Sequence, residues 1–415
     1  MDRLILHSDL NNFYASVEAL YAPHLRKIPF AVAGDPALRH GIVLAKNELA
    51  KRYGVQTGDT LWQAEQKCPD ITFVSPHHSR YSAYSKALQT LYGEYTDCIE
   101  PFGLDECWLD VTGSTGLFGD ASSIAGALRT RIRKEFGLTA SVGVSFNKVF
   151  AKLGSDLKKP DATTHIPRSE FQKIVWPLPV SALLFVGKST CQKLHRYGVR
   201  TIGELANTDK AFLRHLLGKN GVTLWQYANG LDCAPVTAMQ NVPDAKSIGN
   251  STTTPRDLTE EADFRAVFYL LCESVSARLR KAHALCRTVQ IGVRDNTLCS
   301  YERQGALSAP ARAAEALFER AFSLFLESHP EDQPVRTLSV RACNLLHQEH
   351  EQLSLFSDPG ELHLQKEEAL NAAVDAVRKR YGQSALQRGI LLVPEKQELS
   401  RSAGHLQEPC SLLPV

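Results

Sequence analysis

The sequence predicts a protein of the α+β class that is built from several domains. Residues 1–20 and 77–167 follow the order strand, helix, strand, strand, helix, strand, which is that of a split βαβ or ferredoxin-like sheet. Residues 168–231 are typical of an all-helical segment, and residues 245–345 again alternate strands with helices. The 415 residues are enough for two to four domains of ordinary size.

The first pattern begins with a short apolar strand at residues 3–8, which ends at Asp9. A helix is expected over 11–20, and a second strand over 105–112. Residues 120–136 have the spacing of an amphipathic helix that closes at Gly137, and 139–145 alternate like a strand. Residues 21–76 interrupt this order with short strands and helices, so we expect them to form a small lobe of their own.

The second α+β pattern follows a proline-containing linker at 232–244. We expect a strand from 245, a helix over 261–283, one strand over 287–301, a helix over 311–328 and a strand over 335–345. Residues 346–415 form a tail with one further amphipathic helix at 361–381.

Composition excludes some classes of protein and indicates little about partners. The formal net charge is only +2, so a nucleic-acid partner must be argued from local clusters. No run of 18 apolar residues and no signal-peptide pattern is present, and we predict a cytoplasmic chain without a membrane span. The ten cysteines lack metal-site spacing and are interpreted as reduced thiols.

Three acids fall where strands begin or end: Asp9 and the adjacent pair Asp105 and Glu106. A split βαβ sheet places its first strand beside the later hairpin, so these carboxylates can meet at one site. Clustered carboxylates suit a pair of Mg²⁺ ions about 3.5–4 Å apart, as in phosphoryl transfer. Taken alone, the residues have a second interpretation, in which Asp9 caps a helix and the pair consists of solvated turn acids.

The sequence segments around these acids resemble those of a known protein family. SDLNNFYASVE at 8–18 and GLDECWLDVT at 103–112 are similar to the polymerase signatures of Y-family lesion-bypass DNA polymerases, and SVGVSFNKVFAKLGSDLKKPD at 141–161 resembles a third. The resemblance covers about residues 1–345 and is strongest to the bacterial DinB-like branch. It implies a right-hand polymerase with a ferredoxin-like palm (1–20 and 77–167), fingers (21–76), an all-helical thumb (168–231) and a little finger (245–345).

The resemblance also implies roles for individual residues. Asp9 and Asp105 would each bind both Mg²⁺ ions, Glu106 would bind the catalytic one, and the Leu10 carbonyl would complete the nucleotide site. Tyr14, beside Phe13, would be the steric gate that clashes with a ribose 2′-hydroxyl. A core aromatic in an amphipathic helix is the alternative for Tyr14.

Lys159 would contact the triphosphate, although the lysine run around it could also be a solvated face. The predicted fingers depart from the family, because Ala45, Glu48 and Lys51 stand where many members have a threonine, a tyrosine and an arginine. Of these three, only Lys51 keeps a charge suited to phosphate. Ile42 and Leu44 would cover the nascent base pair.

The DNA-contact predictions rest on a hairpin and on scattered basic residues. Residues 181–206 resemble a helix-hairpin-helix, with the turn at Val186-Gly187 and a helix from Ser189 or Thr190 that could hold a phosphate. An ordinary helix corner and scattered surface cations are the alternatives. The predicted DNA-binding residues are Lys148, Lys152, Gly187, Lys246, Arg294 and Arg341.

The tail contains QLSLF at 352–356, which resembles the peptide that binds the bacterial sliding clamp (β clamp). Its expected contact residues are Gln352, Leu353, Leu355 and Phe356. The predicted function is therefore a monomeric, template-directed DNA polymerase for translesion synthesis that uses dNTPs, primer-template DNA and two Mg²⁺ ions. The alternatives are a non-catalytic scaffold, which would predict lost carboxylates, and another palm enzyme, which would lack the hairpin lobe and the second α+β domain.

Overall fold

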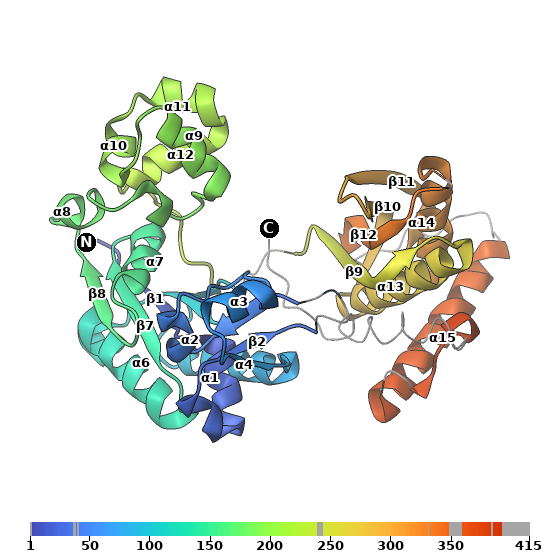
Figure 1. The fold of residues 1–415 in the computed structure, drawn as a ribbon, viewed down its shortest axis with the longest axis horizontal. Helices are drawn as coiled ribbons and strands as arrows, with labels where there is room; N and C mark the ends of the chain where they lie inside the picture. The colour runs from blue at the N-terminus through green and yellow to red at the C-terminus, as the bar shows by residue number, and fades with distance from the viewer. Residues whose placement is uncertain are drawn as a thin grey trace. The chain divides into compact units, whose positions relative to one another are not determined.

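The fold is described from a computed structural model, which covers residues 2–35, 39, 41–238, 244–330, 332–347, 359–382 and 385–391. Contacts divide the chain into two compact units (Figure 1), one made of residues 1–32 and 43–242 and the other of 33–42 and 243–415. In the described part of the chain, no helix is both long and apolar enough to cross a membrane.

A five-stranded sheet in the order β5-β6-β1-β7-β8 is the centre of the first unit. Its strands are β1 (Ile5–Leu10), β5 (Ile99–Pro101), β6 (Glu106–Asp110), β7 (Ala140–Ser145) and β8 (Thr163–Ile166). Strand β1 runs antiparallel to both β6 and β7, which is the predicted ferredoxin-like order. Strand β8 was not predicted and extends the sheet parallel to β7.

The two faces of this sheet differ in character. Leu6, Leu10 and Leu109 pack in one apolar core with residues of the helices on that face. The helices of this region are α1 (Phe13–Tyr21), α4 (His78–Gly93), α5 (Thr115–Phe118) and α6 (Ala121–Phe136). Asp120 accepts a hydrogen bond from the Ser123 amide and caps α6, and Gly137 ends the helix in the left-handed conformation, as predicted.

Helix α7 (Lys148–Leu157) lies against the opposite side of β1 and β7. The close approach depends on Gly143, because a Cβ at that position would overlap the Ala151 carbonyl oxygen of α7. Asn147 caps the helix by accepting from the Phe150 amide. The helix therefore holds its polar side chains within reach of β1.

The predicted small lobe at 21–76 contains a three-stranded sheet in the order β3-β2-β4. Its elements are η1 (Pro23–Lys27), β2 (Phe30–Ala33), β3 (Val43–Lys46), α2 (Glu48–Arg52), α3 (Leu61–Lys67) and β4 (Thr72–Val74). Thr60 and Gln63 form a capping box at the start of α3.

Residues 168–231 fold into short helices, as predicted. They are α8 (Phe171–Val175), η3 (Val180–Ala182), α9 (Lys188–Arg196), α10 (Ile202–Asn207), α11 (Lys210–Leu217) and α12 (Lys219–Ala228). Helix α9 begins at Lys188 with Gly187 at its N-cap, one or two residues before the predicted start.

The second unit contains a four-stranded antiparallel sheet in the order β11-β10-β12-β9. Its elements are β9 (Ser247–Leu258), α13 (Glu261–Lys281), β10 (Ala284–Asp295), β11 (Ser300–Ala311), α14 (Ala314–Ser328) and β12 (Val335–His347). The single strand predicted over 287–301 is wrong, because the chain turns after Asp295 and returns as β11. Strand β11 is largely exposed, so its sequence lacks the alternation of a half-buried strand.

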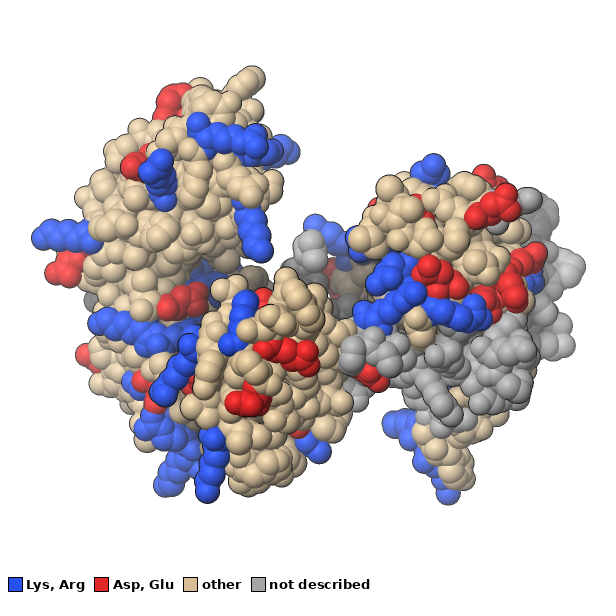
Figure 2. Space-filling model, in the orientation of Figure 1, with Lys and Arg blue, Asp and Glu red and all other residues tan. Residues whose placement is uncertain are grey.

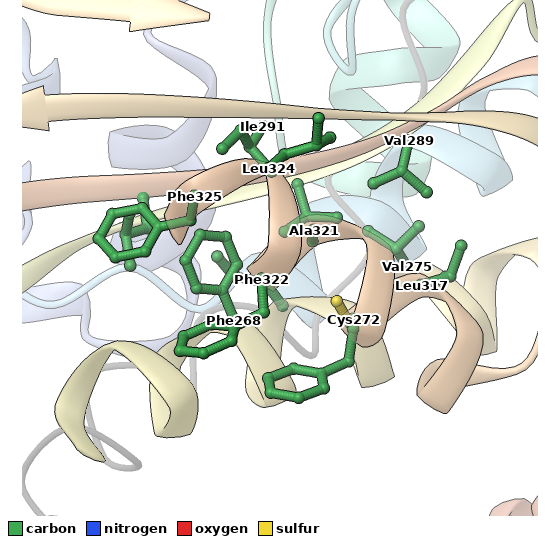
Figure 3. Packing of buried hydrophobic residues seen from close by; sticks show 14 of the residues in the cluster. Phe268, Cys272, Val275, Val289, Ile291, Leu317, Ala321, Phe322, Leu324 and Phe325 are labelled. Atoms are coloured by element: carbon green, nitrogen blue, oxygen red, sulfur yellow. The ribbon is translucent and has the colours of Figure 1, made fainter. Parts of the chain in front are cut away.

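One face of this sheet is covered by α13 and α14. Phe268 and Cys272 from α13 meet Phe322 and Phe325 from α14 beneath Val289 and Ile291 of the sheet (Figure 3), and all are buried. The cysteines that the structure describes are free thiols. The tail helix α15 (Pro359–Tyr381) forms as predicted and is followed by η6 (Gly389–Leu391). Lys and Arg side chains of both units are interspersed with acids (Figure 2).

Candidate active site

The site begins where two antiparallel strands place acids opposite each other. Asp9, at the end of β1, pairs directly with Glu106, at the start of β6. Directly opposed residues project from the same face of a sheet, with Cβ atoms about 4.5–5.5 Å apart. Residues 97 positions apart in the sequence are thereby brought together by strand pairing alone.

Asp105 joins this pair from the turn that precedes β6. Its carbonyl accepts a hydrogen bond from the Leu10 amide at 3.1 Å, so its backbone is fixed against the end of β1. Gly103 supplies the turn with φ +88°, a conformation that glycine adopts readily. Because Asp105 precedes the regular strand, it need not face away from Glu106.

Burial makes the charge of this cluster unfavourable. Asp9 is 3% exposed. Burial, together with the nearby Glu106 carboxylate and against the opposing effect of Lys159, raises the pKa of Asp9 to about 7. Burial and the Glu106 carboxylate also raise the pKa of Asp105 to about 6. The two aspartates therefore sit where added positive charge would stabilise them.

Two lysines from the region of α7 supply positive charge. Lys159 Nζ lies 2.6 Å from Asp9 Oδ2 and 2.8 Å from Asp156 Oδ1, and Lys152 Nζ contacts Glu106 Oε2. Although burial opposes it, contacts with His7 and Lys152 lower the pKa of Glu106 to about 2. Glu106 is therefore ionised and contacts the Lys152 ammonium group. The pKa values of Asp9 and Asp105 lie close to neutral pH, so the protonation of these two carboxyl groups depends on the charges of their neighbours.

The donor chemistry of the cluster suits a hard divalent cation, since such ions prefer carboxylate oxygens. The pKa values of Asp9 and Asp105 are raised because the positive groups around these carboxylates only partly balance their negative charge. Across the described residues, however, no group of three or more His, Cys, Asp or Glu side chains is already arranged to hold a metal ion. Ammonium groups lie on Asp9 and Glu106, and a cation would have to displace or share their contacts.

His7 was not singled out in the sequence and is part of this site. It is fully buried on β1, its Nδ1 is 2.9 Å from Ser155 Oγ, and its Nε2 is 3.5 Å from Glu106 Oε2. Burial lowers its pKa, against the raising effect of Glu106. A histidine inside an otherwise apolar strand, two residues before the first acid, is the signal that points to it.

The predicted gate residue Tyr14 lies on α1 with its ring half-buried. The ring stacks on that of Tyr81 from α4, with 4.0 Å between centroids and 9° between planes. Phe13 is buried in the core and its ring is 5.6 Å from that of Tyr14. Glu18, also missed, lies four residues after Tyr14 and accepts the Tyr81 hydroxyl at 2.6 Å. An acid among the apolar residues of an amphipathic helix is the signal that would have found it.

The predicted phosphate-binding lobe carries its cations beside an acid. Lys51 Nζ is 3.5 Å from Glu48 Oε1, which also accepts a hydrogen bond from Asn12 Nδ2 at 2.8 Å. Lys46 is half-buried, and burial together with the nearby Lys51 charge lowers its pKa. Ile42 is 46% exposed and Leu44 is partly buried in β3.

The predicted DNA contacts fall in different surroundings. Gly187 is exposed at the N-terminus of α9, where backbone amides are unpaired within the helix. Lys148 Nζ lies 2.5 Å from Glu100 Oε1, away from the acidic cluster, and Lys152 contacts Glu106 instead of solvent. The sequence predicted both lysines as DNA contacts but could not reveal these partners.

The uncovered face of the second unit's sheet carries the other predicted contacts. Arg294 and Arg341 are exposed there and line a shallow groove of about 400 Å³ with polar neighbours from all four strands. Lys246 is exposed just before β9. The predicted clamp peptide, from Gln352 to Phe356, lies outside the described residues.

Known proteins resemble this chain along most of its length. Residues 8–156 match the model of the impB/mucB/samB family, and residues 245–355 match that of its C-terminal domain. DNA polymerase IV of Acetivibrio thermocellus is 51% identical over 393 residues, covering 94% of this chain and 98% of the relative. DNA polymerase IV 1 of Bacillus subtilis is 37% identical over 404 residues, covering 97% and 95%.

Among solved structures, a Y-family DNA polymerase chimera superimposes with a TM-score of 0.73 at 21% identity, covering 83% of this chain and 100% of the chimera. At that identity the likeness concerns the fold. The family models and the relatives of 51% and 37% identity show that the chain belongs to the Y family of DNA polymerases. Within that family, its curated relatives place it in the bacterial DNA polymerase IV, or DinB-like, branch.

Proposed function

We propose that this protein is a template-directed DNA polymerase that adds dNTPs to a primer 3′ end during translesion synthesis. The observation that carries this proposal is the acidic cluster, in which buried Asp9 pairs opposite the partly buried Glu106 while the Asp105 carbonyl accepts a hydrogen bond from the Leu10 amide. This cluster occurs in a chain that is 51% identical to a DNA polymerase IV along nearly its whole length. Membership of the family implies dependence on a divalent metal.

The finer proposal is that Asp9, Asp105, Glu106 and the Leu10 carbonyl hold two Mg²⁺ ions. When bound, such ions polarise the α-phosphate and make the primer 3′-hydroxyl more acidic. The reaction forms a bond from the primer 3′-oxygen to the α-phosphorus and breaks the bond to pyrophosphate. The chain's contribution is to place these groups and to balance charge.

Lys159 has a specific part in this mechanism. It lies on Asp9 and Asp156 in the described structure, and burial opposes while these two acids favour its charged form. We infer that it turns from Asp9 to the triphosphate when nucleotide and cations bind. Lys51 provides a second cation, while Glu48 would repel phosphate unless its contact with Lys51 persists.

The remaining assignments extend the same proposal. Tyr14 excludes ribonucleotides, next to Phe13, and Ile42 and Leu44 cover the nascent base pair. Gly187 and the exposed basic residues of the second unit, Lys246, Arg294 and Arg341, contact the DNA backbone without reading sequence. Lys148 and Lys152 act within the palm through Glu100 and Glu106. The peptide from Gln352 to Phe356 binds the sliding clamp, and the protein acts as a cytoplasmic monomer.

The decisive experiment is primer extension with dNTPs and Mg²⁺ by the wild type and by Asp105→Asn. We expect the variant to lose at least about a hundredfold in kcat/KM, as when a transition-state charge partner is removed. Asp110→Asn is the matched control, because Asp110 lies at the other end of β6 and its carboxylate accepts hydrogen bonds from the amide and hydroxyl of nearby Thr112. Absence of extension by the wild type would instead favour a non-catalytic scaffold.

A further inference from the structure

The surroundings of Tyr14 contain a polar network that the reaction itself does not use. Glu18 is 3% exposed, yet an aliphatic side chain would fill the same space without the cost of burying a carboxylate. It lies four residues after Tyr14 on α1, so both side chains project from the same face of that helix. Helix α4 packs against α1 (Figure 1).

Tyr81 of α4 touches both of these residues. Its ring stacks on Tyr14 with 4.0 Å between centroids, and its hydroxyl donates to Glu18 Oε1 at 2.6 Å. The His77 backbone amide donates to the same hydroxyl at 3.1 Å. Tyr81 is completely buried, so its ring cannot swing away without breaking these bonds.

The network reaches the surface through two basic side chains. Arg80 Nη1 lies 3.0 Å from Glu18 Oε2 and His77 Nδ1 lies 3.0 Å from Glu18 Oε1, and both of these side chains are partly exposed. The Arg80 guanidinium also covers the Tyr21 ring, one turn further along α1, at 4.1 Å. Residues at the start of α4 therefore contact α1 at Tyr14, Glu18 and Tyr21.

We propose that Glu18 and Tyr81 are positioning residues that set the angle of the Tyr14 ring, and thereby the strength with which this polymerase rejects ribonucleotides. A steric barrier discriminates only as well as it is held, because a ring that can tilt will make room for a 2′-hydroxyl. Stacking fixes the plane of the Tyr14 ring, and the Glu18 bond fixes the stacking partner. This inference rests on the proposed gate role of Tyr14.

Two pairs of variants separate positioning from simple support of the fold. Tyr81→Phe keeps the stacked ring and removes only the hydroxyl that is bonded to Glu18. Glu18→Met and Glu18→Gln are similar in size, but only glutamine can still accept the Tyr81 hydroxyl. Neither replacement leaves a buried unpaired cation, because Arg80 and His77 both reach solvent. Tyr95→Phe, just beyond the other end of α4, is the control for losing a phenol hydroxyl.

The measurement is kcat/KM for a dNTP and for the matching rNTP in primer extension, with thermal denaturation to confirm folding. For Tyr81→Phe and Glu18→Met we expect the dNTP-over-rNTP ratio to fall about tenfold, equivalent to about 1.4 kcal/mol. The change should come from improved use of the rNTP, while dNTP use stays within about threefold. Glu18→Gln and Tyr95→Phe should keep the wild-type ratio within about threefold.

Tyr14→Ala shows which idea fails. If it lowers the ratio while Tyr81→Phe and Glu18→Met do not, Tyr14 is the gate but is held by other contacts, and the positioning inference is wrong. An equal loss for both nucleotides in these two variants would also overturn it, as a purely structural role. If Tyr14→Ala itself leaves the ratio unchanged, the gate assignment fails first, without affecting the polymerase assignment.

Discussion

The two larger sheets of the protein differ in whether their polar side chains are buried or exposed. In the first unit, Asp9 and Glu106 are turned into the protein at the end of a buried strand pair, beneath α7. In the second unit, α13 and α14 cover one face with a largely apolar core, and the other face is polar and open. The sheet of the first unit therefore has charged residues buried at its end, whereas the sheet of the second unit has charged residues exposed on one face.

This difference has consequences for energetics. Enclosed charges need partners, so Asp9, Glu106, Lys152 and Lys159 depend on one another and their effects should not add. The open face has separate charges in solvent. Arg341 pairs opposite Gln290, and Arg294 lies four residues further along β10, about 13 Å at the usual rise of a strand. Such residues should act independently.

The enclosed sheet gives the largest expected effect. Asp9→Asn should reduce kcat for dNTP addition by roughly a thousandfold, while raising the unfolding free energy by about 1 kcal/mol, because a buried carboxylate with a raised pKa becomes neutral. Primer extension and thermal denaturation measure the two changes. Adding Asp105→Asn should cost little further activity, since members of a catalytic unit are not additive. Losses that multiply would contradict the idea of one cooperative site.

The covered face of the second sheet gives the next effect. Phe268 is fully buried between α13 and α14, so Phe268→Ala should destabilise that unit by about 3 kcal/mol through the cavity it leaves. Urea denaturation, followed in the second unit, measures this. At temperatures where the variant is folded, DNA affinity should be unchanged, since the open face is on the other side. A large loss of affinity without unfolding would show that the two faces are coupled.

Substitutions on the open face of the second sheet should each lower the affinity for DNA by a small factor, and these losses should be independent of one another. Arg294→Ala and Arg341→Ala should each weaken primer-template binding about threefold to tenfold and lower the salt dependence by about one ion. The double variant should show the product of the two losses. Lys281→Ala, which removes an exposed charge from the helical side at the end of α13, is the control. Titrations at several salt concentrations test this, and an unchanged salt slope would remove these residues from the DNA surface.

The comparison also explains what the sequence could predict. Strands β1, β6 and β7 were found because buried strands have local apolar patterns, and their split βαβ order fixes which ones are neighbours. The fold of the first unit and the position of its acids therefore follow from local signals. Strand β11 was missed because it lies at the open edge, and its exposed residues show no such pattern.

The partners of the enclosed charges could not be predicted in this way. Lys159 meets Asp9 across 150 positions, and Tyr81 meets Glu18 across 63, so no spacing along the chain links them. Lys152 was predicted to contact DNA from the family-like segment around it, and the sequence did not reveal that it contacts Glu106. Local patterns identify buried strands, whereas the pairing of polar side chains inside the protein depends on how the elements pack.

The smallest expected effect concerns the tail helix, where a mostly buried arginine can be compared with an exposed lysine at the next position. Arg280 of α13 is mostly buried and makes two hydrogen bonds to Asp375 of α15, at 2.7 and 2.8 Å. Because the geometry is that of a paired guanidinium and carboxylate, Arg280→Met should loosen α15 by about 1 kcal/mol. Hydrogen exchange of α15 amides should then speed up about fivefold, with α13 unchanged. Lys281→Met, at the next and exposed position, should leave exchange at the wild-type rate, and equal effects of both substitutions would show that loss of charge, rather than the pairing, is responsible.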